Sequence, residues 1–318
     1  MNGFPDRRYF ARIASDTGFR AGPLETVFRL TQLLGAIDGR FGKELSLRGG
    51  TALNLLHLDV PRLSVDIDLD FVGAADAEQA QTQRPELLAE LEALARSVGY
   101  EPVAERASYA MAHLRLPYVD ADNRSASLKL DINFLDRVPV LPLERLPVRH
   151  PFGDDFPHIE MQTFALPELA AAKTIALVRR ALARDLFDVA MLTEVPGINV
   201  ELVRTALVVR GAGYPPPWPL DYAPGVVETV RPVRWRSEVL ALVRRPIPIS
   251  LDTARGRAAE FVRTVIELGD GHREFLVQLE LGQLRPEVLA QEQVRDRVAA
   301  NPALLWRLQR GTETLEER

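Results

Sequence analysis

Residues 62–71 read Arg-Leu-Ser-Val-Asp-Ile-Asp-Leu-Asp-Phe, and polar and apolar side chains alternate along this stretch without interruption. In a β-strand, successive side chains point to opposite faces. One face therefore carries the oxygen-bearing side chains of Ser64, Asp66, Asp68 and Asp70. Carboxylates this close repel one another unless a cation lies among them, and a hard divalent cation prefers oxygen ligands. The pattern predicts a strand over 64–72 that forms the metal-binding floor of an active site.

The chain just before this strand predicts a phosphate-binding turn. Residues 44–48 form a short predicted strand, Gly49, Gly50 and Thr51 follow it, and a helix is predicted over 52–57. Glycines allow close approach of the backbone, and a helix N-terminus offers amide donors at the positive end of its dipole. Two glycines between a strand and a helix are also common in plain tight turns. The acidic strand that follows favours the phosphate site.

A third carboxylate lies on a predicted hairpin. Residues 113–119 and 127–134 alternate as strands around the polar turn DADNRSA, and Asp131 lies between apolar neighbours on the second of them. A strand aspartate without a partner is costly to bury, so we expect this strand to pair beside the acidic one. Three carboxylates can hold two Mg²⁺ ions, one on a nucleoside triphosphate and one activating an attacking hydroxyl.

The composition narrows the class of protein. The chain has 318 residues, 47% of them hydrophobic, and no cysteine, which excludes disulfides, a thiolate nucleophile and Cys-ligated zinc. Its five histidines are scattered and are expected to be structural. No stretch is apolar enough to span a bilayer and the N-terminus has no secretory core, so we expect a cytoplasmic protein without membrane contact. A net charge of −5 argues against a coat of basic charge but leaves a local basic groove open.

The order of predicted elements indicates an α+β half followed by a helical half. Helices are predicted over 23–38 and 84–98, an irregular connection over 136–166 ends in a strand at 159–164, and one long helix covers 167–193. After Pro196-Gly197 only helices are predicted, broken by PPPWP at 215–219: 199–210, 234–244, 252–268, 271–282, 285–298 and 301–310. We therefore expect a catalytic domain over 1–195 and an α-helical domain over 196–318.

These motifs together resemble the signature of the polymerase-β nucleotidyltransferase superfamily. Within it, LRGGTALNLLHLDVPRLSVDIDLDF (47–71) is similar to the AbiEii/AbiGii toxin family of type IV toxin–antitoxin and abortive-infection systems, which includes mycobacterial tRNA-modifying nucleotidyltransferase toxins. The segment ELAAAKTIALVRRALARDLFDVAML (168–192) resembles that family's lysine and Arg-Asp-x-x-Asp motifs on one long helix, and ANPALLWRL (300–308) resembles its helical tail. The resemblance implies a polymerase-β-like mixed sheet with flanking helices, followed by an α-helical half.

The resemblance also implies roles for individual residues. Gly49, Gly50 and Thr51 would bind the nucleotide phosphates, and Asp66, Asp68 and Asp131 would bind two Mg²⁺ ions, with Asp131 helping to activate the acceptor hydroxyl. Lys173 would neutralise the triphosphate of the NTP substrate, and Asp185 or Asp188 would close the site. Arg48 and Arg62 flank the site and could meet phosphate or RNA.

Ser64 matches an active-site serine that some members of the family need. In some relatives an antitoxin phosphorylates this serine, and a phosphate there would add negative charge beside the metal ligands.

Two features depart from what the chemistry requires. Asp70 extends the acidic strand further than the reaction needs and is expected to face solvent. Asp185 and Asp188 are three residues apart on a predicted helix, so they share a face and the pattern does not separate them. With Arg184 they could equally form ordinary ion pairs on an exposed helix surface.

The function implied by the resemblance is a toxin that transfers a nucleoside monophosphate from an NTP to the 3′ end of tRNA. The product could not be aminoacylated, so translation would stop. The partners implied are tRNA and an antitoxin, either a winged-helix AbiEi-like protein or a kinase. Two alternatives remain: transfer to a small molecule or a protein side chain, and a nucleotide-binding module without catalysis.

Overall fold

The computed structural model describes residues 4–105, 107–153, 156–213, 223–247 and 249–316. These residues form two compact units. The first comprises residues 1–134, 144–163 and 233–250, and the second comprises residues 135–143, 164–232 and 251–318. The predicted PPPWP break at 215–219 lies outside the described residues. The division into functional domains at residue 195 stays a prediction.

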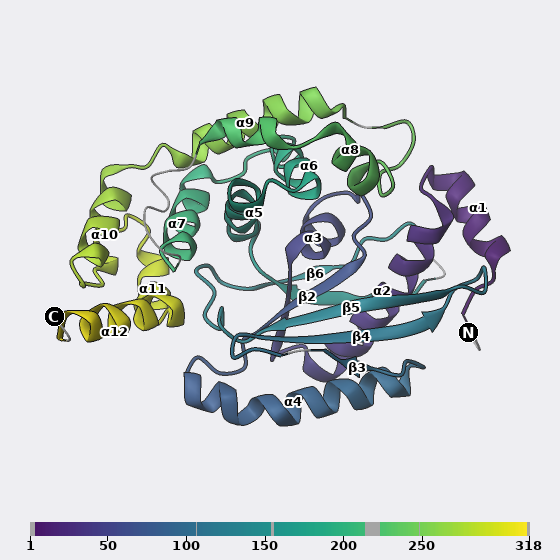
Figure 1. Cartoon of the computed structure of the whole chain (residues 1–318), viewed down its shortest axis with the longest axis horizontal. Coiled ribbons are helices and arrows are strands. Elements are labelled where there is room, and N and C mark those ends of the chain that lie inside the picture. The colour runs from purple at the N-terminus through teal and green to yellow at the C-terminus, as the bar shows by residue number, and fades with distance from the viewer. Residues whose placement is uncertain (1–3, 106, 154–155, 214–222, 248, 317–318) are drawn as a thin grey trace. The chain divides into compact units, whose positions relative to one another are not determined.

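The first unit contains a mixed seven-stranded sheet with the order β3-β4-β5-β2-β1-β7-β6 (Figure 1). Its strands are β1 (Leu45–Arg48), β2 (Asp66–Phe71), β3 (Val103–Ala104), β4 (Met111–Val119), β5 (Ser125–Asn133), β6 (Glu144–Pro147) and β7 (Glu160–Thr163). The predicted acidic strand is thus confirmed as β2, but it begins at Asp66, so Ser64 precedes it. β3 and β6 are short edge strands that the sequence analysis did not predict.

The acidic strand β2 lies in the middle of the sheet because its alternate residues are apolar. Ile67, Leu69 and Phe71 are at most 1% exposed, and they anchor the strand in the core. β2 pairs antiparallel with β1 and parallel with β5, the strand of Asp131. The predicted pairing of these two acidic strands is therefore confirmed.

Helices cover both sides of the sheet. They are α1 (Arg7–Thr17), α2 (Ala21–Phe41), α3 (Gly49–Ala52) with its π-helical continuation η1 (Leu53–His57), and α4 (Ala77–Ser97). Figure 1 shows α3 and α4 on opposite sides of the strands. α4 begins seven residues before its predicted start because Asp76 caps it, accepting a hydrogen bond from the Gln79 amide at 2.8 Å. α1 was not predicted.

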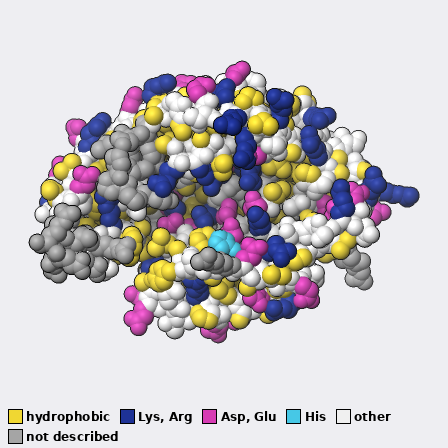
Figure 2. All heavy atoms as spheres, in the orientation of Figure 1, with side chains coloured by type: hydrophobic (Ala, Val, Ile, Leu, Met, Phe, Trp, Pro, Cys, Tyr) yellow, Lys and Arg dark blue, Asp and Glu magenta, His cyan; other side chains and the backbone are white. Residues whose placement is uncertain are grey.

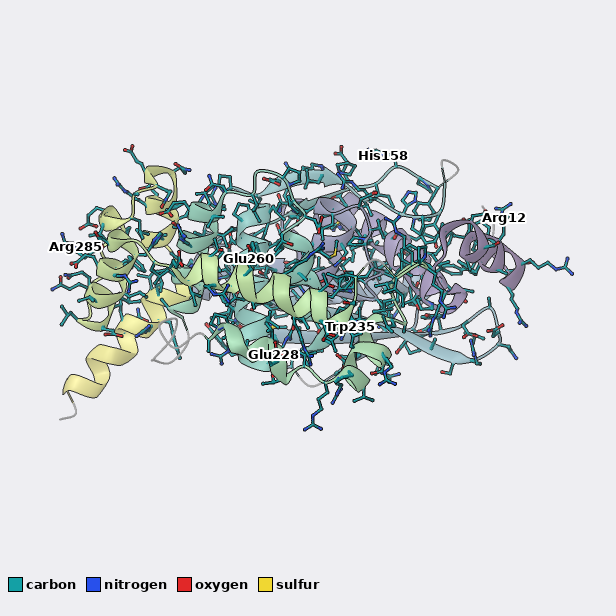
Figure 3. The ribbon with its side chains drawn as sticks, turned by 90° about the horizontal axis from the view of Figure 1, so that it is seen from above. Arg12, His158, Glu228, Trp235, Glu260 and Arg285 are labelled. Carbon is teal, nitrogen blue, oxygen red and sulfur yellow. The ribbon has the colours of Figure 1, made fainter. Side chains whose placement is uncertain are left out.

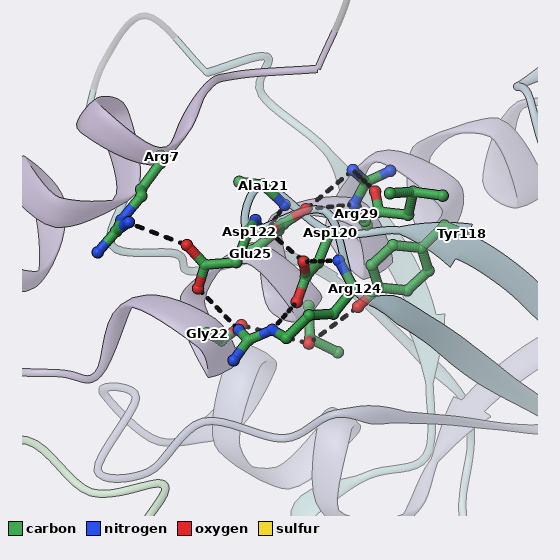
Figure 4. Close-up of polar contacts among 11 residues, drawn as sticks. Arg7, Gly22, Glu25, Arg29, Tyr118, Asp120, Ala121, Asp122 and Arg124 are labelled. Atoms are coloured by element: carbon green, nitrogen blue, oxygen red, sulfur yellow. Dashed lines mark hydrogen bonds and ion pairs between the residues drawn. The ribbon is translucent and has the colours of Figure 1, made fainter.

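The β4–β5 hairpin, which carries Asp131, is tied to α2 by a buried ion pair (Figure 4). Arg29 donates to Glu25 at 2.9 Å and to the Val119 carbonyl at 3.2 Å. Glu25 in turn accepts a hydrogen bond from the Ala121 amide in the hairpin turn, at 2.8 Å. A charge-assisted network that also satisfies backbone groups fixes the turn, and with it the register of the two strands.

A late segment of the chain, residues 233–250, also belongs to the first unit. The Leu63 amide donates to the Leu242 carbonyl at 2.8 Å, and Arg62 and Val243 form an antiparallel bridge. This backbone contact lies immediately before the acidic strand. The predicted helix over 234–244 is confirmed only in its first part: α8 (Pro232–Arg234) continues into the π-helical turn η3 (Trp235–Val239), and the residues after it are not helical.

The second unit is helical. Its longer elements are α5 (Leu166–Arg180), α6 (Ala183–Leu192), α7 (Val200–Gly211), α9 (Leu251–Ile266), α10 (Asp270–Glu280) and α12 (Pro302–Glu316). Figure 3 labels Glu260 on α9. The short elements are η2 (Pro224–Thr229), η4 (Pro286–Val288), η5 (Glu292–Val294) and α11 (Arg295–Ala299), so the predicted helix over 285–298 is wrong.

The stretch predicted as one long helix, 167–193, is helical over most of its length but is not continuous. It is two helices, because Ala181 adopts a left-handed conformation with φ of 48° and ends α5. In the described part of the chain, no helix combines the length and apolar character needed to cross a membrane.

Candidate active site

Three of the predicted carboxylates lie on two neighbouring strands of the first unit. Asp66 and Asp68 share one face of β2 and both are partly exposed, while Ile67 between them and Leu69 after them are buried. In the parallel pairing with β5, Asp68 lies directly opposite Asp131. Neighbouring strands are about 4.8 Å apart, so the sheet brings these two carboxylates side by side. The three acids predicted from the sequence therefore lie in one small region.

The glycine turn meets the same carboxylates from the end of β1. The helix α3 begins at Gly49 itself, one turn earlier than predicted, with Arg48 at its N-cap position. Gly49 has a φ of 71°, and a Cβ atom there would lie 2.3 Å from Oδ2 of Asp68. Only glycine meets both conditions, a left-handed backbone and contact with a carboxylate. The first amides of a helix have no acceptor within the helix itself, and such amides are donors that suit an anion.

Two buried polar side chains hold this turn against the acidic strand. The Thr51 hydroxyl donates to the carbonyl of Asp66, and Asn54 Nδ2 donates to the Gly50 carbonyl at 2.9 Å. Both side chains are fully buried. The Thr51 hydroxyl thus fixes the start of β2 in this structure, and the backbone amide is the group of Thr51 that suits a phosphate. Asn54 was not singled out from the sequence.

Asp131 has a histidine partner that the sequence analysis missed. His113 Nδ1 lies 2.7 Å from Asp131 Oδ1, and the two residues face each other across the β4–β5 pair. Both side chains are about one-third exposed, so the contact lies at the surface of the sheet. The arrangement fixes the orientation of Asp131, since one carboxylate oxygen is held and the other is left to a ligand.

Two predictions about the edges of the site are wrong. Asp70 was expected to face solvent, but it is fully buried and its Oδ1 lies 2.7 Å from Arg48 Nε. Arg62 was expected to flank the site as a contact for phosphate or RNA. It is only 2% exposed, and its Nη1 donates to the Leu63 carbonyl at 2.9 Å. Both charges are used inside the fold, where burial demands partners.

Ser64 lies just before β2 and is only 4% exposed. Its neighbour Leu63 is held by the backbone hydrogen bond to Leu242. A modifying enzyme would therefore reach the Ser64 hydroxyl only after the surrounding chain had opened.

The remaining predicted residues form a buried charged cluster in the second unit. Lys173 Nζ on α5 lies 2.7 Å from Asp188 Oδ2 and 3.3 Å from Asp185 Oδ1, both on α6. Arg180 also binds Asp185, through Nε at 2.6 Å and Nη2 at 3.0 Å. Both aspartates are at most 1% exposed. The alternative of an exposed, ion-paired helix surface is therefore wrong, and Arg180 is a member that the sequence analysis missed.

The donor chemistry of the first cluster suits a hard divalent cation. Asp66, Asp68 and Asp131 offer carboxylate oxygens, the ligands that Mg²⁺ prefers, at the point where glycine removes side-chain bulk from Asp68. Among the described residues, however, no three His, Asp or Glu side chains converge into a ready-made metal cluster. Asp131 is turned towards His113, so it would have to share or change that contact to join the other two.

Comparison with known proteins gives matches of two kinds. The model of the family described as nucleotidyl transferase AbiEii toxin, type IV toxin–antitoxin system, matches residues 32–262. The solved structure of MenT4, a nucleotidyltransferase toxin from Mycobacterium tuberculosis, is similar with a TM-score of 0.63 and 20% identity, over 93% of this chain and 99% of that one. A putative nucleotidyltransferase from H. pylori is similar with a TM-score of 0.47 and 16% identity, over 81% and 97% of the two chains. No curated protein matches the sequence.

The likeness to MenT4 confirms the predicted fold class. The similarity covers 93% of a chain that consists of a mixed sheet with flanking helices and a helical second unit.

Proposed function

Because this chain belongs to the AbiEii nucleotidyl transferase toxin family of type IV toxin–antitoxin systems, we propose that it transfers a nucleoside monophosphate from an NTP to the 3′ end of tRNA. Such an addition would block aminoacylation and stop translation. The observation that carries the proposal is the meeting of Asp68, Asp131 and Gly49 in one unit. The family supports the transferase activity and the toxin role, and the tRNA acceptor is our proposal.

In the proposed reaction, the 3′-hydroxyl oxygen attacks the α-phosphorus of the NTP. A new P–O bond forms, the bond to the bridging oxygen of the β-phosphate breaks, and pyrophosphate leaves. Asp131 takes the hydroxyl proton or passes it to solvent, and the contact with His113 keeps it oriented for that task. The backbone amides of Gly49, Gly50 and Thr51 bind the phosphates, with Arg48 beside them.

Asp66, Asp68 and Asp131 are the residues that would hold Mg²⁺. The ions would supply charge neutralisation at the triphosphate and a lower pKa for the attacking hydroxyl. We further propose that Lys173, with Asp185 or Asp188, serves the nucleotide. The buried contacts of Lys173 with both aspartates support a precisely held ammonium group.

A type IV toxin implies a cognate antitoxin. We propose a winged-helix AbiEi-like protein or a kinase that phosphorylates Ser64, whose burial makes a kinase dependent on local opening. We also propose a cytoplasmic location, where NTPs and tRNA are found, and a division into a nucleotidyltransferase domain over 1–195 and a helical domain over 196–318.

The test is to incubate the protein with Mg²⁺, each of the four NTPs labelled at the α-phosphate, and total tRNA. We expect label in tRNA with the wild-type protein and none with Asp66→Asn. Asp59→Asn is the matched control, because it removes an exposed aspartate outside the acidic strand and should leave labelling unchanged. Sequencing of tRNA 3′ ends would identify the added nucleotide.

Label that enters only a small molecule or a protein would overturn the tRNA acceptor. Growth inhibition that survives Asp66→Asn would instead support action by binding without turnover.

A further inference from the structure

The segment 233–250 departs from the charge of the rest of the chain. It contains four arginines, Arg234, Arg236, Arg244 and Arg245, against a single carboxylate, Glu238, whereas the whole chain carries a net charge of −5. All four arginines are exposed. Figure 2 shows Lys and Arg side chains in dark blue at the surface over α8, where this segment begins. An acidic protein thus presents a local excess of positive charge.

The arginines of this segment differ in what they contact. Arg234 forms an ion pair with Glu238 at 2.7 Å. Arg236, Arg244 and Arg245 have no carboxylate partner within the described part of the chain. Surface arginines of a folded domain commonly pair with acidic neighbours, and three without such a partner leave their guanidinium groups ready for an external anion.

The backbone of the segment is well anchored. Trp235 and Val239 are buried, while Arg234 and Arg236 are exposed, so η3 turns its apolar side inward and its arginines outward. Arg245 N donates to the Gly18 carbonyl at 2.9 Å, and Leu242 accepts from Leu63 at 2.8 Å. A rigid support lowers the entropy cost of binding a partner through these side chains.

The hydrogen bond between Leu63 and Leu242 places the arginine-rich segment close to the acidic strand. Leu63 is three residues before Asp66, and three residues of extended chain span roughly 10 Å. An RNA strand whose 3′ end reached Asp66 would carry its preceding phosphates across neighbouring surface. Those phosphates are repelled by the acidic strand and need compensating positive charge next to it.

We infer that Arg236, Arg244 and Arg245 form a docking surface for the phosphate backbone of the acceptor RNA. The inference rests on the proposed transfer to tRNA, and it names the surface that holds the strand while the acidic strand acts on its end. Guanidinium groups bind phosphate bidentately and independently of sequence, so this surface sets affinity and position rather than the choice of base.

The experiment measures binding of 5′-labelled tRNA without NTP, so no turnover is needed. In the triple variant Arg236→Ala, Arg244→Ala, Arg245→Ala we expect the Kd for tRNA to rise roughly tenfold or more. The slope of log K against log salt should fall by roughly one for each arginine that contacts phosphate. The triple Arg→Lys variant should keep most of the slope, because it keeps the charge.

The matched control removes three other exposed arginines: Arg8→Ala, Arg12→Ala, Arg263→Ala. Figure 3 labels Arg12 on α1. This control has the same net charge as the test variant, and we expect its Kd to stay within about twofold of wild type, since Arg8, Arg12 and Arg263 lie outside the segment 233–250 that is proposed to hold the RNA. Equal weakening in both triple variants, or tRNA binding that the test variant retains in full, overturns the inference.

The labelling reaction separates this inference from the proposed function. If tRNA is labelled equally well by the wild-type protein and the test variant, the docking surface is wrong and the transfer stands. If no RNA is labelled but the test variant still loses tRNA affinity against its control, the acceptor is wrong and the surface stands. A test variant that binds tRNA normally but escapes neutralisation by the antitoxin would assign the surface to a protein partner and overturn the RNA assignment.

Discussion

Gly49 is the residue on which the site depends most directly. Its φ of 71° and the 2.3 Å that would separate a Cβ from Asp68 leave room for hydrogen alone. Gly99 has a similar φ, 92°, but a Cβ there would meet nothing within 4 Å. An alanine at Gly99 would therefore introduce backbone strain alone, whereas an alanine at Gly49 would also clash with the Asp68 carboxylate.

We expect Gly99→Ala to lower the free energy of unfolding by about 1–2 kcal/mol, the cost of a left-handed alanine, without affecting nucleotide transfer. Gly49→Ala should cost at least as much stability and also reduce the transfer rate on the order of 100-fold, because it displaces Asp68. Urea unfolding and the tRNA-labelling rate measure the two effects. Equal transfer rates in both variants would show that Asp68 need not lie where the glycine allows it.

For single residues, the sequence showed which face of a strand each side chain lies on, but not which side chains from other strands contact it. Alternation was sufficient to place Asp66 and Asp68 together and Asp131 beside them. It did not show that Asp70 is buried, because burial depends on Arg48 from another strand. The contact of Asp131 with His113 depends on register. The seven-residue turn predicted over 120–126 would put Arg115 opposite Asp131, whereas the actual loop of 120–124 puts His113 there.

The helices α5 and α6 are joined through one lysine, Lys173. Lys173 is 7% exposed and bridges two buried aspartates, so its charge is needed by the fold as well as by any ligand. Removing Lys173 takes the ammonium group away from the buried Asp188 carboxylate, while Asp185 keeps its contact with Arg180, and the loss of one partner of a buried ion pair is costly.

We expect Lys173→Met to lower the free energy of unfolding by about 3–5 kcal/mol. Lys43→Met is the control: Lys43 is exposed, and its loss should change stability by no more than about 0.5 kcal/mol. Urea unfolding curves at neutral pH give both values. If Lys173→Met proves as stable as Lys43→Met, the cluster is not the stabilising centre of these helices, and lost transfer in Lys173→Met would then report on the nucleotide alone.

The break between α5 and α6 could not be predicted from local sequence. Ala181 lies in a run of good helix formers with no glycine or proline, and such a run favours one continuous helix. The left-handed turn at Ala181 is set by tertiary packing, since it folds α6 back so that Asp185 and Asp188 meet Lys173. The sequence pattern placed Asp185 and Asp188 on one face of a helix. It did not show that Lys173 lies on a separate helix that packs against that face.

At the scale of the molecule, the second unit contains a buried histidine that links stability to pH. His272 is 3% exposed and its Nε2 lies 2.9 Å from the Thr205 hydroxyl. Burial lowers the pKa of His272 from its ordinary value of 6.5, and the nearby Glu201 only partly opposes this. The folded protein therefore keeps His272 neutral at a pH at which the unfolded chain binds a proton.

The sign follows from this difference. The contribution of neutral His272 to the free energy of unfolding is fully present above about pH 6.5. It is lost as the pH falls below that value, by at most about 1.4 kcal/mol per pH unit. We expect His272→Gln to show a shallower decline than wild type in urea unfolding between about pH 7.5 and pH 5.5. His158→Gln, at an exposed position, should decline as wild type does. Identical slopes in all three proteins would mean that His272 titrates alike in the folded and unfolded states.

Which segments of the chain belong to each unit was the hardest feature to predict from the sequence. A short, arginine-rich stretch that follows several helices carries no local sign that its Leu242 will bind Leu63, 179 residues earlier in the chain. The contact with Leu63 is made by backbone groups, which every residue has, so no side-chain pattern announces it.

That same contact has a consequence for how the protein is made. The acidic strand leaves the ribosome well before residues 233–250, the segment that hydrogen-bonds beside it. A nascent or truncated chain that ends before residue 233 holds every carboxylate of the site and lacks the acceptor for Leu63. The backbone contact that completes the first unit thus forms only after residue 242 has been synthesised, 179 residues after Leu63.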